Sequence, residues 1–142
     1  MRSQSKLYRE SRLLLGVLVL SAAFVYSYRA QAATGAQPIP DGVPMKSWQD
    51  NGRDGRYLLQ VIKGELPKVL KSVKGTVTSD TDCDADAQGL SHCHNTIKLA
   101  NGSEITVIDS HNMHRYRCLG SGDRISLTLV GKSWVMGTLS GK

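Results

Sequence analysis

Apolar positions follow two patterns along the chain: one continuous run near the start, and short alternating segments after residue 75. The continuous run covers residues 13–26, comes after Arg2, Lys6, Arg9 and Arg12, and precedes Ala30-Gln31-Ala32. A basic region, an apolar region and a small-residue cleavage pattern in this order are typical of a signal peptide. We therefore predict that residues 1–32 are a signal peptide and that the protein is exported, to the periplasm or the extracellular space.

The apolar run is short for a membrane span. It has 14 residues, whereas a spanning helix needs about 20, and this difference favours cleavage. Arg29 follows the run closely, so the alternative is an uncleaved membrane anchor that contacts the bilayer through residues 13–28.

Residues 33–56 have no apolar period and are rich in Gly, Pro and polar residues. Such a composition is typical of loops and linkers. We predict a flexible arm here, in which Trp48 packs against the side of the domain that follows.

A short helix is one prediction for the segment before the alternating strands. Leu66, Val69, Leu70 and Val73 have the spacing of an amphipathic helix, with Pro67 near its start and Gly75 past its end. The stretch is equally compatible with a direct lead into a strand, because Val69, Val73 and Val77 share strand parity.

From residue 75 onward, apolar and polar residues alternate in short segments separated by turn residues, which is typical of β-strands. A hairpin is predicted around Ala100-Asn101-Gly102, because a three-residue loop places Ile97, Leu99, Ile105 and Val107 on one face. Gly102 would supply the positive φ of this loop. The predicted strands are residues 75–79, 95–99, 104–109, 124–129 and 133–139.

About five short strands with one short helix indicate a mainly β domain over residues 57–142. Closing such strands into a barrel removes exposed sheet edges. The predicted fold is therefore a small OB-like or SH3-like barrel.

Net charge argues against nucleic-acid binding. The chain has 18 basic and 12 acidic residues, but residues 1–32 hold five of the former and one of the latter. The remainder carries a net charge of only +2, without the basic footprint of a general nucleic-acid binder.

The chain has three cysteines, and exported thiols normally oxidise. The favoured disulfide joins Cys93 to Cys118 and ties the hairpin to the next connection. The alternative joins Cys83 to Cys93 and closes the loop between them. Either pairing leaves one thiol over.

All four histidines lie between Cys83 and Cys118. The hairpin register brings residues 92–94 near residues 111–114, with Cys93 and His111 on the core face and the first two histidines facing outward. Imidazole, thiolate and thioether groups favour soft or borderline metals. We predict a copper or zinc site formed by His92, His94, His111, His114 and Met113.

Two other metal patterns are incomplete. Asp80, Asp82, Asp84 and Asp86 alternate as in a calcium loop, but Ala85 replaces the turn glycine and Ser91 the bidentate glutamate, which favours a solvated acidic loop. Leu90 occupies the place of the first cysteine of a haem-attachment motif, so haem is excluded.

The pattern Gly89-x-x-His92, the hairpin with Gly102, His111-Asn112 and Gly122-Asp123 before a strand resemble an uncharacterised family of small exported OB-like barrels. The resemblance covers roughly residues 75–130 and implies a barrel and export, with no implied activity. The cysteines depart from that family's pattern.

The leading functional hypothesis is an exported binding module for a transition metal. The alternative is a structural or interaction domain that binds an envelope protein and is stabilised by a disulfide. A third is a thiol-dependent enzyme with Cys93 or Cys118 as nucleophile, although the chain has no Cys-x-x-Cys motif.

Overall fold

A computed structural model describes residues 36–68 and 71–141 of the chain. The chain divides into two compact units, Met1–Thr34 and Gly35–Lys142, and every described residue belongs to the second. The predicted signal peptide or anchor therefore lies outside the described residues. Within them, no helix has the length and apolar character needed to cross a bilayer.

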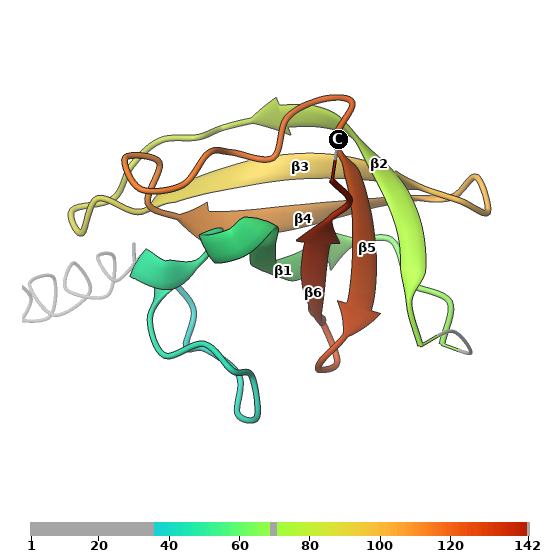
Figure 1. Ribbon diagram of the computed structural model, residues 1–142, viewed down its shortest axis with the longest axis horizontal. Helices are drawn as coiled ribbons and strands as arrows, with labels where there is room; N and C mark the ends of the chain where they lie inside the picture. Colours follow the sequence, from blue (N-terminus) through green and yellow to red (C-terminus); the bar gives the residue numbers. More distant parts are fainter. Residues whose placement is uncertain (1–35, 69–70, 142) are drawn as a thin grey trace, which may run out of the picture. The chain divides into compact units, whose positions relative to one another are not determined.

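Six antiparallel strands close into a barrel, which confirms the predicted mainly β barrel (Figure 1). Going round it, the order is β1-β4-β3-β2-β5-β6, and β6 pairs again with β1. The strands are β1 (Arg56–Lys63), β2 (Val73–Thr81), β3 (Ser91–Leu99), β4 (Glu104–His111), β5 (Arg124–Leu129) and β6 (Trp134–Leu139).

The barrel has one strand more than predicted. Without β1, the chain forms a meander, β2–β3–β4, and a hairpin, β5–β6. The first strand of the meander, β2, pairs with β5. This is the strand order of an OB barrel. β1 pairs with both β4 and β6 and so fills the remaining gap. Its pattern was hard to recognise because Tyr57, Leu58 and Leu59 are all buried, without alternation.

The predicted hairpin is confirmed. Ile97 is paired with Ile105, the loop is Ala100-Asn101-Gly102, and Gly102 has φ +88°. Inward residues of β3 and β4 join those of the other strands in one core. Its members are Tyr57, Leu59, Val73, Val77, Ile97, Leu99, Ile105, Val107, Leu119, Ile125, Leu127 and Val135.

The residues that the structure describes between 66 and 73 form no helix, so the predicted short helix is wrong there. Leu66 and Pro67 have no regular structure, and Val73 begins β2 and pairs with Leu127. Val73 contributes to the barrel core as a strand residue, so tertiary packing decided between the two compatible patterns. Across residues 36–68 and 71–141, the helical elements are two 3₁₀ turns, η1 (Trp48–Asp50) and η2 (Arg53–Gly55).

The predicted flexible arm needs correction at its C-terminal end. Asn51 is buried, its Nδ2 donates to the carbonyls of Leu58 and Ser110, and its Oδ1 accepts from the amide of Leu58. The Trp48 ring packs on Trp134 with centroids 5.8 Å apart, as predicted for this tryptophan. Hydrogen bonds thus join the end of the arm to β1 and β4.

Candidate functional site

The structure pairs Cys83 with Cys93, so the favoured Cys93–Cys118 pairing is wrong and the alternative is confirmed. Cys93 is an inward residue of β3, and Cys83 lies in the β2–β3 loop that returns to this strand. Cys118 remains a free thiol of intermediate exposure. Pairing of β2 with β3 places the loop that bears Cys83 beside Cys93, and sequence spacing cannot reveal that proximity.

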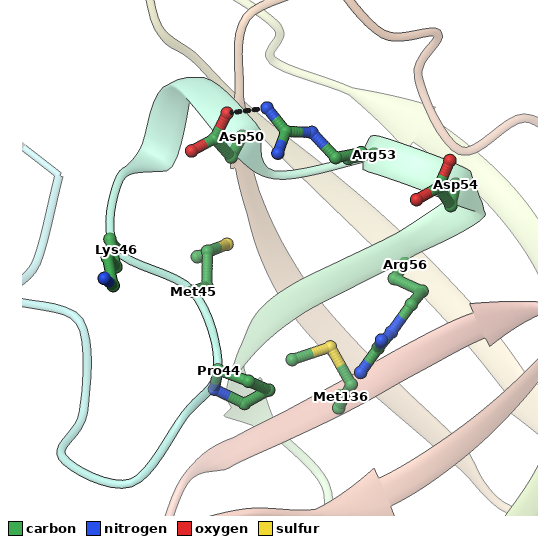
Figure 2. A pocket seen from close by; sticks show the side chains of 8 residues that line it. All are labelled: Pro44, Met45, Lys46, Asp50, Arg53, Asp54, Arg56 and Met136. Carbon is green, nitrogen blue, oxygen red and sulfur yellow. Dashed lines mark hydrogen bonds and ion pairs between the residues drawn. The ribbon is translucent and has the colours of Figure 1, made fainter.

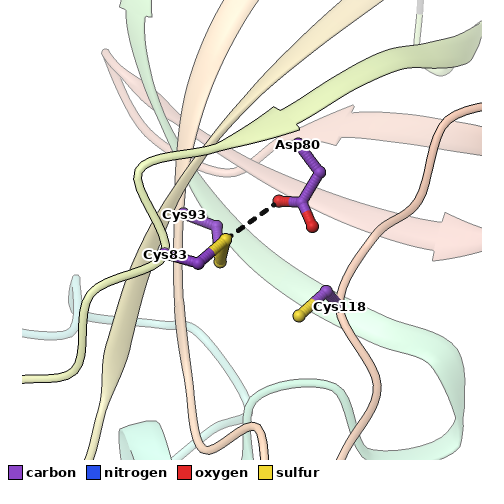
Figure 3. Close-up of side chains that lie close together, drawn as sticks. All are labelled: Asp80, Cys83, Cys93 and Cys118. Carbon is purple, nitrogen blue, oxygen red and sulfur yellow. Dashed lines mark hydrogen bonds between the residues drawn. A yellow bond between two sulfur atoms is a disulfide. The ribbon is translucent and has the colours of Figure 1, made fainter.

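All three cysteines nevertheless meet at one place. One ligand atom from each of Asp80, Cys83, Cys93 and Cys118 lies within 4.8 Å of the others. Figure 3 shows Cys118 facing the disulfide from a separate segment, with the Asp80 carboxylate beside both. We call these four residues the Cys/Asp cluster.

Strand geometry explains how Asp80 and Cys83 reach the cluster. Asp80 and Asn95 are cross-strand partners of β2 and β3. Asp82 then adopts φ +56°, a conformation that aspartate tolerates better than most residues, at the point where the chain leaves β2. The Asp80 Oδ1 atom lies 3.3 Å from Cys83 Sγ, a contact that becomes a hydrogen bond when a reduced thiol regains its proton.

Asn95 connects the strands to the segment that bears Cys118. Its Nδ2 lies 2.9 Å from Asp80 Oδ1 and 3.3 Å from the carbonyl of Leu119, and it donates to both. The side chain is buried in the inward row of β3, between Cys93 and Ile97. Asn95 was missed from the sequence, although a polar residue at a core-facing strand position is a usable signal.

Electrostatics favour the protonated form of the free thiol. Burial raises the pKa of Cys118, and the negative charges of Asp80 and Asp109 raise it further, against smaller lowering effects of a backbone hydrogen bond and of Arg117. A thiol of this kind is a weak nucleophile near neutral pH, but a metal ion that replaces its proton can still bind it.

A buried acid–base pair lies next to the cluster. Asp109 is the cross-strand partner of Cys93, and both it and His111 are fully buried. His111 Nδ1 is 3.1 Å from Asp109 Oδ2, an ion-pair distance without hydrogen-bond geometry. Burial raises the pKa of Asp109. Burial lowers the pKa of His111, but the Asp109 carboxylate raises it by more, so the net shift is upward.

The predicted histidine site is not assembled. The register of the hairpin is as predicted, with Cys93 and His111 inward. Both ring nitrogens of His92 are occupied, Nδ1 by Ser110 Oγ at 2.8 Å and Nε2 by Asp86 Oδ2 at 3.0 Å. His94 Nδ1 lies 3.1 Å from Asp82 Oδ2.

The remaining predicted ligands lie apart from these. Met113 and His114 are exposed in the turn after β4, whereas His111 is buried within the barrel. Within residues 36–68 and 71–141, the Cys/Asp cluster is the group in which three or more metal-ligating side chains converge. It contains no histidine. Alternation along β3 sends His92 and His94 to one face and Cys93 to the other, and this separates these two imidazoles from the thiols.

The acidic loop is only partly solvated. Asp86 Oδ1 accepts from the amides of Gln88 at 2.8 Å and Leu90 at 3.0 Å, while its other oxygen contacts His92. Burial raises the pKa of Asp86, but these hydrogen bonds outweigh that effect and lower it overall. Asp80, Asp82 and Asp86 therefore have separate hydrogen-bond partners, and Asp84 is exposed. Of these four aspartates, only Asp80 belongs to the group of converging ligand atoms among the described residues.

A hollow of about 290 Å³ lies elsewhere on the barrel (Figure 2). The ion pair between Asp50 and Arg53 lies on its rim, and no member of the Cys/Asp cluster lines it. Its lining is Pro44, Met45, Lys46, Asp50, Arg53, Asp54, Arg56 and Met136. The mixed charges select no ligand class, so the cluster is the stronger candidate.

Comparison with family models, with curated proteins and with solved structures finds no match for this chain. The case for a function therefore rests on the chemistry of the Cys/Asp cluster itself.

Proposed function

We propose that this chain is an exported β-barrel module that binds a transition metal, zinc or copper(I), when its disulfide is reduced. The ligands are Asp80, Cys83, Cys93 and Cys118. The observation that carries the proposal is the convergence of their four ligand atoms within 4.8 Å.

The spacing suits a tetrahedral ion. Thiolates bound to zinc at about 2.3 Å in a tetrahedron lie about 3.8 Å from one another. Ligand atoms already within 4.8 Å need only small side-chain movements to reach that spacing. Three sulfurs with one carboxylate oxygen favour zinc or copper(I) over the hard cations calcium and magnesium.

The redox state controls the number of ligands. With Cys83 bonded to Cys93, only Asp80 and Cys118 keep their full ligand capacity. Reduction by two electrons adds two thiols and completes a four-ligand set. Metal binding then competes with protonation of the thiols, so affinity decreases as pH falls.

Export is part of the proposal and rests on the order of basic, apolar and small residues in the leader. Cell fractionation, followed by sequencing of the mature N-terminus, is expected to give an extracytoplasmic protein that begins near Ala33. A cytosolic pool with intact Met1 would contradict export without affecting the metal site.

Cobalt(II) is a suitable probe, because thiolate coordination gives it an intense charge-transfer band. The reduced full chain is expected to bind one equivalent, which zinc displaces, and the oxidised chain much less. Cys118→Ser and Asp80→Asn are expected to weaken binding, and Cys118→Ser is expected to lose more charge-transfer intensity than Asp80→Asn, because it removes one of the three thiolates. The matched control His94→Ala is expected to bind as the wild type does.

Two results would overturn the metal-binding proposal. The first is a reduced wild type that binds zinc more weakly than about 10 μM, far weaker than structural zinc sites. The second is binding that survives Cys118→Ser but is lost in His94→Ala. If neither the Cys/Asp cluster nor the predicted histidine site binds metal, the alternative is favoured: an envelope interaction domain stabilised by its disulfide.

A further inference from the structure

The barrel holds Cys118 in place beside a disulfide to which it does not belong. Tyr57 Oη donates to the carbonyl of Arg117 at 2.7 Å, and Asn95 Nδ2 donates to the carbonyl of Leu119 at 3.3 Å. The side chain of Leu119 is itself buried in the core. Contacts on both sides of Cys118 therefore fix the backbone that carries the thiol.

A charged contact strengthens the same segment. Arg117 Nη1 lies 2.6 Å from Asp123 Oδ2, and the same carboxylate oxygen accepts from the amide of Gly120 at 2.8 Å. The segment around Cys118 is thus held by a salt bridge and by a hydrogen bond from a backbone amide to the same carboxylate. The position of the thiol follows from these contacts.

The free sulfur is within reach of both disulfide sulfurs. Cys118 Sγ lies within 4.8 Å of Cys83 Sγ and of Cys93 Sγ (Figure 3). Thiol–disulfide exchange proceeds by attack of a thiolate on one sulfur of the disulfide. A thiol held this close reacts at an effective concentration that no external thiol reaches.

We propose that Cys118 exchanges with the Cys83–Cys93 disulfide, so that the three cysteines share one disulfide between two arrangements. The Cys118 thiolate attacks Cys93 Sγ, and the Cys93–Cys118 bond forms as the Cys83–Cys93 bond breaks. Cys83 leaves as a thiolate and takes up the proton that Cys118 lost. No electrons enter or leave, so the step needs no oxidant or reductant.

The fold favours Cys83 as the leaving group. Cys93 is fully buried in β3, which is paired on both sides, and so it stays in place. Cys83 lies outside the strands in the β2–β3 loop and is partly exposed. Exchange therefore moves the free thiol from the β4–β5 connection to this loop. It takes place in the oxidised protein without metal and so does not depend on the proposed function.

Trapping of free thiols tests the exchange. The oxidised full chain is incubated at about pH 9.5, above the ordinary thiol pKa of about 8.5, because the pKa of Cys118 is raised. It is then alkylated with N-ethylmaleimide, digested and mapped by mass spectrometry. We expect two species: one alkylated at Cys118, and one alkylated at Cys83 that contains a linked Cys93–Cys118 peptide. The matched control Cys118→Ser is expected to give only the Cys83–Cys93 link. Alkylation of the wild type at Cys118 alone would overturn the proposal.

A second variant tests the product directly. Cys83→Ser, oxidised with glutathione disulfide at low protein concentration, is expected to form a monomeric Cys93–Cys118 disulfide. Two free thiols in a variant with a cooperative unfolding transition would overturn the proposal. If Cys83→Ser does not fold, the wild-type mapping decides.

Discussion

At the residue scale, single polar side chains organise the loop that leads into the Cys/Asp cluster. Asp86 closes the β2–β3 loop by accepting from the amides of Gln88 and Leu90 and by contacting His92. Asp84, in the same loop, is exposed. Two neighbouring acids of the same type therefore differ in their contribution to stability.

Replacing Asp86 by Ala should lower the free energy of unfolding by about 1–3 kcal/mol, because two amides lose their acceptor. The pKa of Asp86 is lowered in the folded state, so its contribution is present above the unfolded pKa of about 3.9 and is lost as pH falls below it. Urea denaturation at several pH values measures both effects. Asp84→Ala is the control, and equal losses in the two variants would contradict the assignment.

His111 and Asp109 form the other residue-scale feature, a buried pair whose pKa values are both raised. The folded state therefore binds more protons than the unfolded state, and stability should fall as pH rises through the unfolded pKa of His111, about 6.5, toward its folded pKa. Denaturation between about pH 6 and pH 8 should reveal this decrease.

The double variant Asp109→Asn/His111→Gln, which removes both titrating groups, should abolish the pH dependence over that interval. If the free energy of unfolding of the wild type does not change over this pH interval, the pKa of His111 is not raised by folding, and the assignment is wrong.

At the element scale, the β3–β4 hairpin sets the register that places Cys93 and Asp109 side by side. Its turn depends on Gly102, which has φ +88°, and a Cβ atom added at this position would meet no other atom within 4 Å. Strain in a variant at this position therefore comes from the backbone and involves no steric clash.

Gly102→Val should lower the free energy of unfolding by about 1 kcal/mol or more, whereas Gly102→Asn should cost less, because asparagine tolerates positive φ. Gly141→Val, near the chain end and also without close neighbours, is the control. The denaturation midpoints of the three variants give the comparison. Equal midpoints for Val and Asn at position 102 would show that backbone conformation is not the cause.

At the scale of the whole molecule, six strands close around one core, and the disulfide closes a short loop at one end of it. Cys83 and Cys93 are separated by 10 positions. A loop of this length contributes about 3 kcal/mol in the chain-entropy model.

Reduction of the disulfide should lower the free energy of unfolding by about 3 kcal/mol. Zinc added to the reduced chain should recover part of this loss by mass action, because the proposed site binds it more tightly in the folded state than in the unfolded chain. Denaturation of oxidised, reduced and zinc-loaded protein tests both statements. Cys118→Ser should respond to reduction as the wild type does but should lack the recovery by zinc.

What the sequence by itself determined is local. Alternation and turn residues predicted the β class, and the parity of Ile97, Leu99, Ile105 and Val107 predicted the hairpin and its loop. The same parity placed Cys93 and His111 inward. These features depend only on the two-residue period of a strand and on the positive φ of Gly102.

The tertiary structure decided everything that depends on distant segments. β1 lacks alternation because Leu58, which is not part of the barrel core, is buried as fully as Tyr57 and Leu59. Val73 belongs to a strand because it packs in the barrel core. Pairing of β2 with β3 places Asp80 beside the Cys83–Cys93 disulfide, and the β4–β5 connection brings Cys118 to the same place, while His92 and His94 have other partners. Sequence spacing gives order along the chain, whereas a metal or an exchanging thiol requires proximity in space, and the approach of Cys118 to the other two cysteines comes from tertiary packing.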